Sequence, residues 1–345
     1  MRRLLIWLVV FILMVCMISV FSLIGCKTTA AVETTSAVET TAADDATLDL
    51  TGKKVALLVL GTQTPYLPPY METVKKGFAD VGIELTVFDA AFDAALQATQ
   101  MDDAIALNPD LILLFPLDSQ AVSPGIKKAF DSGIPILVDN NKVIQDDQQY
   151  TIAYVGPDTY DQGLKCGELM DKVLEGKGKV AIIEGYPGQE AQINRSQGFE
   201  DKIKEINSGI EVVAKQTGEW VKAKATSLME DYLVRFPDLS GLYAADDTMA
   251  VGALVAMEEA GIEKGAIKVI GIGGSKEGLA AIKDGSMYGT VLQSPVLEAN
   301  LAVEFSIKIL EMGLKAGDQL DPYLNFQPAP VITAENVEEY LPGEW

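Results

Sequence analysis

The run Val55-Ala56-Leu57-Leu58-Val59-Leu60 decides the fold, because six consecutive apolar side chains need a dry environment on both sides of the backbone. Such a run is typical of a strand covered on both faces, as in a parallel sheet. Residues 70–81 then favour a helix, and residues 83–88 favour a second strand. The alternation continues to a last predicted helix at residues 296–312. Alternating strands and helices predict parallel, doubly wound α/β sheets.

The number of predicted strands and the length of the chain both indicate two lobes. About ten strands follow from the pattern, which is more than one twisted sheet usually holds. A length of 345 residues also suggests about two domains. We therefore predict two α/β lobes, each built on its own parallel sheet.

A different pattern precedes the globular part. Arg2-Arg3 stands before an apolar run at residues 4–24, which is typical of an export signal. The run ends in Leu23-Ile24-Gly25-Cys26, which resembles the lipobox of bacterial lipoproteins. This resemblance implies that residues 1–25 are a signal peptide and that Cys26 carries lipid. The alternative is an uncleaved membrane helix, since the run approaches the ~20 residues that span a bilayer.

Residues 26–51 are predicted to form a disordered tether. The segment Ala-Val-Glu-Thr-Thr occurs at residues 31–35 and again at residues 37–41. A stretch without aromatic residues or apolar periodicity cannot bury enough surface to order itself. Both interpretations of the N-terminus place the globular part outside the cytoplasmic membrane.

The composition argues against several classes of function. A net charge of −22 repels phosphate backbones, so no nucleic-acid partner is expected. The chain has no histidine, which removes the commonest general base and metal ligand. Cys16 and Cys26 belong to the signal and the anchor, and Cys166 is predicted to be a buried, inert thiol. We expect no metal site, no cofactor and no internal disulfide.

Polar and aromatic side chains follow the predicted strands. Ligands of open α/β sheets bind beyond the carboxyl ends of the strands. Amides and carboxylates bind pairs of hydroxyls, and aromatic faces cover the C–H side of a sugar ring, so these ends predict a carbohydrate or polyol site. The alternative for any one of them is a turn or a helix cap, and for a lone Asn or Asp at a strand end we prefer that alternative. The segments are 61–66, 116–119, 139–141, 185–189, 217–220, 246–247, 273–275 and 293–295.

Four stretches carry a resemblance to a known family. Two of them are residues 55–59 leading to Pro65-Tyr66, and residues 116–122 with their Pro-x-Asp-Ser segment. Residues 194–199 match Arg-x-x-Gly-Phe, and residues 245–253 match Asn-Asp-x-Met-Ala-x-Gly-Ala with Asp at the usual Asn. Over about residues 53–327 the chain resembles the sugar-type substrate-binding proteins of bacterial ABC importers, the ribose/galactose-binding (type I periplasmic binding protein) family.

This resemblance implies two doubly wound parallel-sheet lobes joined by a three-segment hinge. Residues 52–156 with 295–321 would form the N-terminal lobe, and residues 157–294 with 322–345 the C-terminal lobe. The chain would cross between them near Gly156, Ser294 and Pro322.

The resemblance also implies which residues contact the ligand. Tyr66 and Trp220 would be opposing aromatic walls, and Arg195 would be a cationic donor fork. The sequence departs from the family at Gly271-Ile272-Gly273-Gly274, where Gly-x-Asp-Gly is common, and at Leu67, where a second aromatic is common. We interpret the glycine-rich segment as a turn, because it lacks the spacing of a dinucleotide-binding loop. The implied ligand-binding residues are Tyr66, Asp139, Asn140, Asn141, Arg195, Trp220, Asp246 and Gln293.

The function implied is that of a lipid-anchored, monomeric binding protein that is not an enzyme. It would capture a sugar or polyol by hinge closure and hand it to an ABC permease. Two alternatives stay open. One is a sensory protein that presents its ligand to a membrane receptor, and the other is a glycoside-processing lipoprotein that uses Asp139 and Asp246 as a carboxylate pair.

Overall fold

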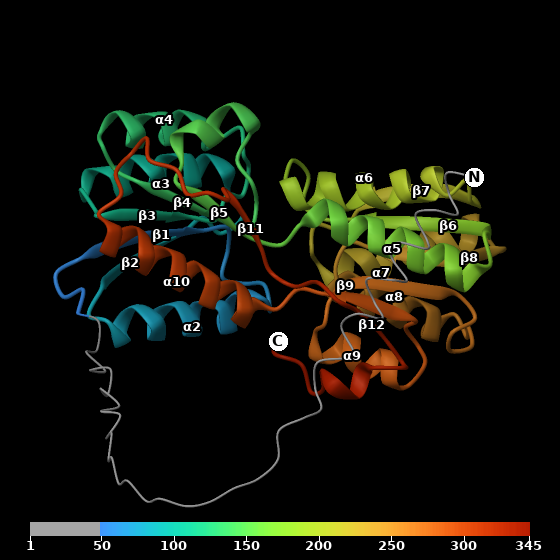
Figure 1. Ribbon diagram of the computed structural model, residues 1–345. Coiled ribbons are helices and arrows are strands. Elements are labelled where there is room, and N and C mark those ends of the chain that lie inside the picture. The colour runs from blue at the N-terminus through green and yellow to red at the C-terminus, as the bar shows by residue number, and fades with distance from the viewer. Residues whose placement is uncertain (1–48) are drawn as a thin grey trace, which may run out of the picture. The chain divides into compact units, whose positions relative to one another are not determined.

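Two six-stranded sheets organise residues 49–345, which are the part of the chain that this computed structural model describes. Helices cover the faces of each sheet, and Figure 1 shows the resulting pair of α/β lobes. The predicted fold class, two doubly wound lobes with parallel sheets, is confirmed.

The first sheet has the strand order β11-β5-β4-β3-β1-β2, and all its neighbouring strands are parallel. Each of β1, β2, β3 and β4 is followed by a helical segment that leads to the next parallel strand, and the chain leaves this sheet after β5. The elements are β1 (Lys54–Val59), α2 (Leu67–Asp80), β2 (Glu84–Asp89), α3 (Ala94–Ala106), β3 (Leu111–Leu114), α4 (Ser123–Asp131), β4 (Ile136–Asp139), the 3-10 helix η1 (Gln145–Tyr150), β5 (Ala153–Gly156), α10 (Pro295–Met312) and β11 (Leu324–Phe326).

The second sheet has the order β12-β10-β9-β8-β6-β7. Its strands are parallel except for the edge strand β12, which runs antiparallel to β10. The elements are α5 (Thr159–Leu174), β6 (Lys177–Glu184), α6 (Glu190–Glu205), β7 (Gly209–Thr217), α7 (Lys222–Arg235), β8 (Leu239–Ala244), α8 (Asp247–Glu259), β9 (Lys268–Gly273), α9 (Lys276–Lys283), β10 (Gly289–Leu292), β12 (Val331–Thr333) and the 3-10 helix η2 (Val337–Glu339).

Strand β1 shows why its sequence is continuously apolar. Leu57 and Val59 belong to the core under α2 and α10, whereas Ala56 and Leu58 belong to the core under α3 and α4. Successive side chains of a strand point to opposite faces of the sheet. Since helices keep both faces dry, no position of β1 between Val55 and Val59 reaches water.

The chain passes between the lobes three times, after β5, after β10 and after β11. The prediction of the third crossing near Pro322 is wrong, because Leu324–Phe326 pairs with β5 in the first sheet. The crossing lies between Phe326 and Val331 instead. A three-residue strand is too short to show an alternating pattern, so its sequence carried no signal.

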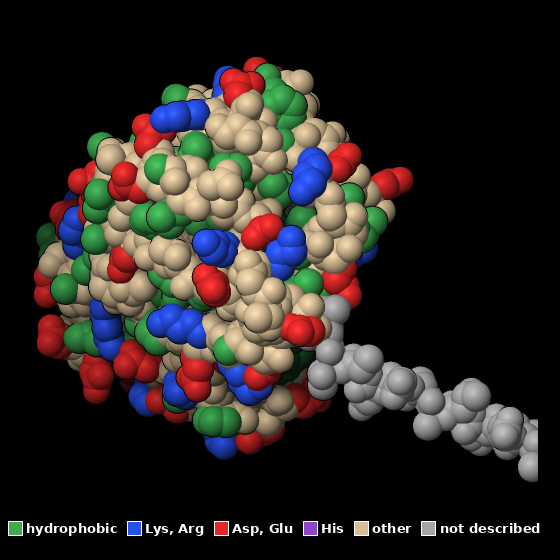
Figure 2. All heavy atoms as spheres, turned by 90° about the vertical axis from the view of Figure 1, so that its left-hand side faces the viewer, with side chains coloured by type: hydrophobic (Ala, Val, Ile, Leu, Met, Phe, Trp, Pro, Cys, Tyr) green, Lys and Arg blue, Asp and Glu red, His purple; other side chains and the backbone are tan. Residues whose placement is uncertain are grey.

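The predicted signal peptide, Cys26 and nearly all of the predicted tether lie outside the described residues. Within residues 49–345, no helix has the length and the apolar character needed to cross a bilayer. On the face of the molecule drawn in Figure 2, acidic side chains are interspersed with Lys and Arg rather than gathered in one patch.

Candidate functional site

A pocket of about 620 Å³ lies where the carboxyl ends of the strands of the two sheets approach each other. This figure counts all the space between the lining atoms, including the part that is open to solvent. Both lobes and the β10–α10 crossing supply its walls. Aromatic rings and a few polar groups line it together, which is the composition expected of a site that binds one small polar ligand.

The structure brings seven of the eight predicted ligand-binding residues to this pocket. Most of them follow a strand directly, so the common direction of the strands collects side chains that are far apart in the sequence. Arg195 differs, because it reaches the pocket from within α6. The seven residues are Tyr66, Asn140, Asn141, Arg195, Trp220, Asp246 and Gln293.

Asp139 is the predicted residue that does not line the pocket. It is the last residue of β4, fully buried, and its carboxylate accepts a hydrogen bond from the Tyr70 hydroxyl of α2. Burial raises the pKa of Asp139 well above its usual range, and the nearby Glu298 carboxylate raises it further. Asp139 therefore stands behind the wall, and the carboxylate pair suggested for glycoside processing does not form across the pocket.

Arg195 is buried and already engaged by the protein. Its Nε donates to Gln162 Oε1 at 3.1 Å, its Nη1 donates to the Ala245 carbonyl at 2.8 Å, and its Nη2 donates to the side chain of Gln293. These contacts use three of the five N–H donors of a guanidinium. Arg195 lines the pocket together with Asp246, the other lining residue with an ionisable acidic or basic side chain.

Trp220 packs against the second lobe as well as the pocket. Its backbone is left-handed, with φ 61°, as is that of Glu219 with φ 55°. Its indole N–H donates to Gln189, and its ring covers Gly185, where a Cβ atom would overlap the indole. The Arg195 guanidinium lies 5.8 Å from the ring centroid, within the range of a cation–π contact. A non-glycine residue in this backbone region marks a position that its surroundings hold in place.

Tyr66 does not have Trp220 as its aromatic contact. Its ring meets the ring of Trp345 edge-on, with centroids 5.7 Å apart and planes at 79°. Its hydroxyl donates to Glu298 Oε2 at 2.9 Å and accepts from Gln293 Nε2 at 3.2 Å. The Tyr66 hydroxyl is therefore oriented by the second crossing and by α10, and its ring by Trp345.

Glu298 is a buried residue of α10 that the sequence analysis missed. Its carboxylate accepts from Asn140 Nδ2 at 2.7 Å, from the Tyr66 hydroxyl and from Gln327 Nε2 at 2.8 Å. It thereby joins two pocket residues to the third crossing. Burial raises the pKa of Glu298 to about 7, although the hydrogen bonds from Asn140 and Tyr66 act in the opposite direction.

Asp246 and Asp247 follow β8 and have different roles. Asp246 caps α8 by accepting from the Met249 amide at 2.8 Å, and burial raises the pKa of its pocket-lining carboxyl to about 7. Asp247 accepts from the amides of Gly274 and Ser275 at 2.7 and 2.9 Å and from the Thr290 hydroxyl at 2.7 Å. It holds the glycine-rich segment after β9, which is a turn as interpreted from the sequence.

Three aromatic residues of the pocket were not predicted. Phe92 follows β2 with a left-handed backbone, Phe115 follows β3, and Trp345 comes from the C-terminal segment. The rule that ligands bind beyond strand ends would have found Phe92 and Phe115. No local pattern marks Trp345, since its place depends on how the last residues pack against the rest of the molecule.

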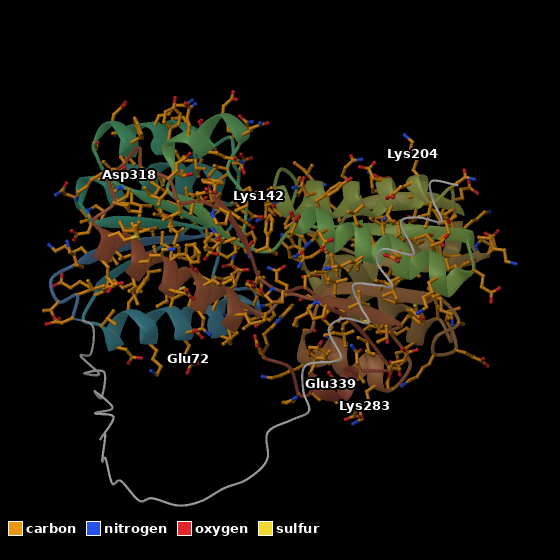
Figure 3. The ribbon with its side chains drawn as sticks, in the orientation of Figure 1. Glu72, Lys142, Lys204, Lys283, Asp318 and Glu339 are labelled. Atoms are coloured by element: carbon orange, nitrogen blue, oxygen red, sulfur yellow. The ribbon has the colours of Figure 1, made fainter. Side chains whose placement is uncertain are left out.

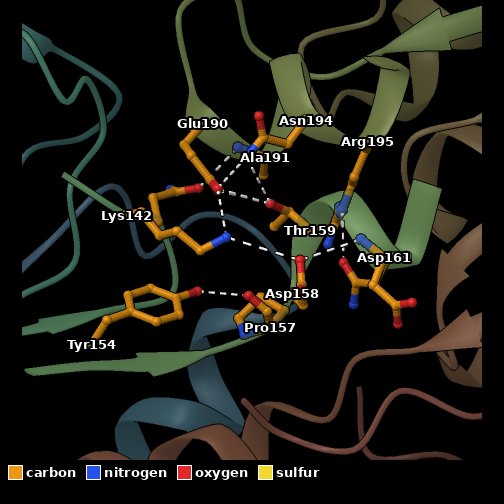
Figure 4. Close-up of polar contacts among 12 residues, drawn as sticks. Lys142, Tyr154, Pro157, Asp158, Thr159, Asp161, Glu190, Ala191, Asn194 and Arg195 are labelled. Atoms are coloured by element: carbon orange, nitrogen blue, oxygen red, sulfur yellow. Dashed lines mark hydrogen bonds and ion pairs between the residues drawn. The ribbon is translucent and has the colours of Figure 1, made fainter. Parts of the chain in front are cut away.

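Lys142 joins the two lobes beside the pocket, and Figure 3 shows it at their boundary. Its ammonium lies 3.2 Å from Glu190 Oε1 at the start of α6 and 3.9 Å from Asp158 Oδ1 in the first crossing. Figure 4 shows that the Glu190 carboxylate also accepts from Thr159 and Asn194. Burial raises the pKa of Glu190, against the effect of Lys142.

Metal ligation and thiol chemistry would each need suitable side chains among the described residues. Residues 49–345 contain no group of three or more Cys, Asp or Glu side chains arranged to hold a metal ion. Cys166 is free and fully buried, and burial raises the pKa of its thiol. The thiol is therefore protonated and shielded, which suits the predicted inert role.

Residues 55–315 match a family model described as a periplasmic binding protein domain. The ribose import binding protein of Bacillus subtilis is 31% identical over 260 residues, which cover 74% of this chain and 81% of that protein. The xylitol-binding protein of Mycolicibacterium smegmatis is 33% identical over 260 residues, covering 74% and 70%. A solved structure from Bacillus halodurans, an ABC transporter solute-binding protein with bound myo-inositol, superposes with a TM-score of 0.76 at 28% identity and covers 85% and 98% of the two chains.

Proposed function

The chain belongs to the periplasmic binding protein family, and on that premise we propose that it captures a sugar or polyol for an ABC importer. Its relatives are solute-binding proteins and not enzymes, and the same holds for this chain. Membership of this family also implies that the globular part works outside the cytoplasm.

The observation that carries this proposal is the pocket between the lobes. It combines amide, carboxyl and guanidinium groups with the rings of Tyr66, Phe92, Phe115, Trp220 and Trp345. Hydrogen-bonding groups beside aromatic faces suit a ligand with many hydroxyls on one side and C–H groups on the other. A strongly charged ligand is a poorer fit, because most N–H groups of Arg195 already have protein partners.

We propose that the two lobes close on the ligand by a hinge motion. The pocket takes residues from both lobes, so the full set of contacts exists only while the lobes are together. A ligand that binds this state better shifts the population toward it. Opening would break two contacts between the lobes. One is the ion pair of Lys142 with Glu190, and the other is the hydrogen bond that the Ala191 amide donates to Asn141 Oδ1 at 3.2 Å.

We propose that the protein is a monomer and that residues 26–51 act as a tether between the membrane and the globular part. We further propose that lipid attached to Cys26 holds the protein at the membrane. Exchanging Cys26 for serine (Cys26→Ser) removes the thiol that lipid would modify. We expect this variant to leave the membrane fraction or to accumulate with residues 1–25 still attached. Unchanged membrane extraction of Cys26→Ser would support an uncleaved helical anchor instead.

A thermal-shift screen of the full chain against pentoses, hexoses, polyols and nucleosides tests the binding function. A ligand at 100 times its dissociation constant stabilises a protein by about 2.7 kcal/mol, which is readily detected. We expect one or a few carbohydrates or polyols to raise the melting temperature. If no compound of these classes does so, while calorimetry also shows no binding, the proposed ligand class is wrong.

A further inference from the structure

Residues 343–345 lie between the two lobes, as the position of the C-terminus in Figure 1 shows. The Trp345 carbonyl accepts from the Lys276 amide at 2.6 Å, at the start of α9 in the second lobe. The Glu344 carboxylate accepts from the Ser294 hydroxyl at 2.6 Å and from the Val296 amide at 3.2 Å, at the start of α10. The segment is thus held to the second lobe and to the β10–α10 crossing by its backbone and by Glu344, independently of the Trp345 side chain.

Two glycines make room for this arrangement. Gly273, at the end of β9, has φ 152°, and a Cβ atom there would lie 2.7 Å from Cζ2 of the Trp345 indole. Gly343 has φ 88°, and a Cβ atom there would lie 3.0 Å from the Lys276 amide nitrogen. The indole of Trp345 therefore occupies the space that any larger residue at position 273 would fill.

The indole faces the pocket and has an unused donor. Trp345 lines the same pocket as Tyr66, and the two rings meet edge-on at 5.7 Å. Its Nε1–H is buried and has no hydrogen-bond partner within residues 49–345. A buried N–H group without a partner is costly, and tryptophan N–H groups usually find one. By contrast, the indole N–H of Trp220 already donates to Gln189.

On the basis of the sugar- or polyol-binding function proposed above, we propose that Trp345 is a ligand-contacting residue. Its ring forms the wall of the pocket beyond β9, against the C–H side of the ligand, and its Nε1–H donates to a hydroxyl or ring oxygen. The end of β9 then presents an aromatic face and one donor to the ligand, where Gly273 has no side chain of its own. Trp345 is thereby a residue that determines specificity.

Two substitutions separate the ring from its N–H. Trp345→Phe keeps an aromatic face and removes the donor, and Trp345→Ala removes both. The full chain is titrated by calorimetry with D-ribose, xylitol and myo-inositol, and then with any other compound that is positive in the screen. We expect the affinity to be about tenfold weaker for Trp345→Phe and about a hundredfold weaker for Trp345→Ala. The matched control is Tyr340→Ala, since Tyr340 lies just before residues 343–345 but packs on the second core without lining the pocket. We expect it to lower the melting temperature and leave the affinity unchanged.

Fluorine NMR of the 5-fluorotryptophan-labelled chain gives a readout that does not depend on a variant's stability. The Trp345 resonance, assigned by its loss in Trp345→Phe, should shift when the bound sugar or polyol saturates the protein. If wild type binds a carbohydrate but neither the affinity of Trp345→Ala nor this resonance changes, Trp345 is only a structural residue and the binding function stands. If wild type binds no compound of the screen, the binding function fails and the role of Trp345 fails with it.

Discussion

Replacing Lys142 with methionine tests whether contact between the lobes controls affinity. Lys142→Met keeps an unbranched side chain of similar length beside Tyr154 and Phe326, over whose rings the ammonium lies at 5.6 and 5.3 Å. It removes the charge that faces Glu190 at 3.2 Å and Asp158 at 3.9 Å. Because Lys142 belongs to the first lobe and Glu190 to the second, removing this ion pair destabilises the state in which the lobes are in contact.

The magnitude follows from the distance and the burial. Two unit charges at this separation attract by about 5 kcal/mol at an effective dielectric constant of about 20, before desolvation is subtracted. Exposed pairs contribute about 0.2–1 kcal/mol, and removing one partner of a buried pair costs about 3–5 kcal/mol. The side chains of Lys142 and Glu190 are 18% and 12% exposed, which places the pair between these cases. We expect a loss of about 2 kcal/mol, or about thirtyfold in the apparent dissociation constant.

Calorimetry with the sugar or polyol found in the screen measures this loss, and small-angle X-ray scattering of the ligand-free protein reports the separation of the lobes. Lys128→Met is the matched control, because Lys128 pairs with Asp102 at 2.7 Å within one lobe and both side chains are more than half exposed. The double variant Lys142→Met/Glu190→Gln should recover part of the affinity, since it leaves no unpaired buried carboxylate at position 190. The reasoning is refuted if Lys142→Met and Lys128→Met change the affinity equally, or if Lys142→Met changes it less than twofold.

Three further predictions follow from the site. Trp220→Ala should weaken ligand binding by about 1–3 kcal/mol and remove the contribution of Trp220 to the ligand-induced fluorescence change; a sharply lower melting temperature with unchanged affinity in calorimetry would identify Trp220 as core only. The folded pKa of Glu298, about 7, exceeds its ordinary value of 4.5, so the folded state binds the extra proton and stability falls as pH rises between these values. In urea unfolding, the free energy of unfolding of Glu298→Gln should therefore fall less than that of the wild type between pH 4.5 and 7, by at most about 3 kcal/mol. Parallel curves of this free energy against pH for the two proteins would contradict the role of Glu298. Asp247→Asn removes the charge and replaces one of two acceptor oxygens with an NH2 donor, so it should weaken the hydrogen bonds from Gly274, Ser275 and Thr290 and lower the free energy of unfolding in urea by about 2 kcal/mol. An unchanged value would mean that the turn after β9 holds without this carboxylate.

Local sequence determined the fold class and most of the pocket. The apolar run at Val55 needs helices on both faces of a sheet, and the repeated alternation of such runs with helical patterns allows little except doubly wound lobes. Parallel strands end at one edge, so the polar residues after each strand, such as Asn140 and Gln293, were found without any knowledge of their neighbours.

Only the tertiary structure decided which side chains meet. Tyr66 and Glu298 are 232 positions apart, and their hydrogen bond depends on α10 returning to the first lobe. Whether Asp139 faces the pocket or Tyr70 depends on the direction in which β4 ends, and strand β11 forms only because β5 offers an edge. Trp345 reaches the pocket because Gly273 leaves space for an indole. These are contacts between distant segments, and a local pattern of residue types carries no information about which distant surface will lie opposite.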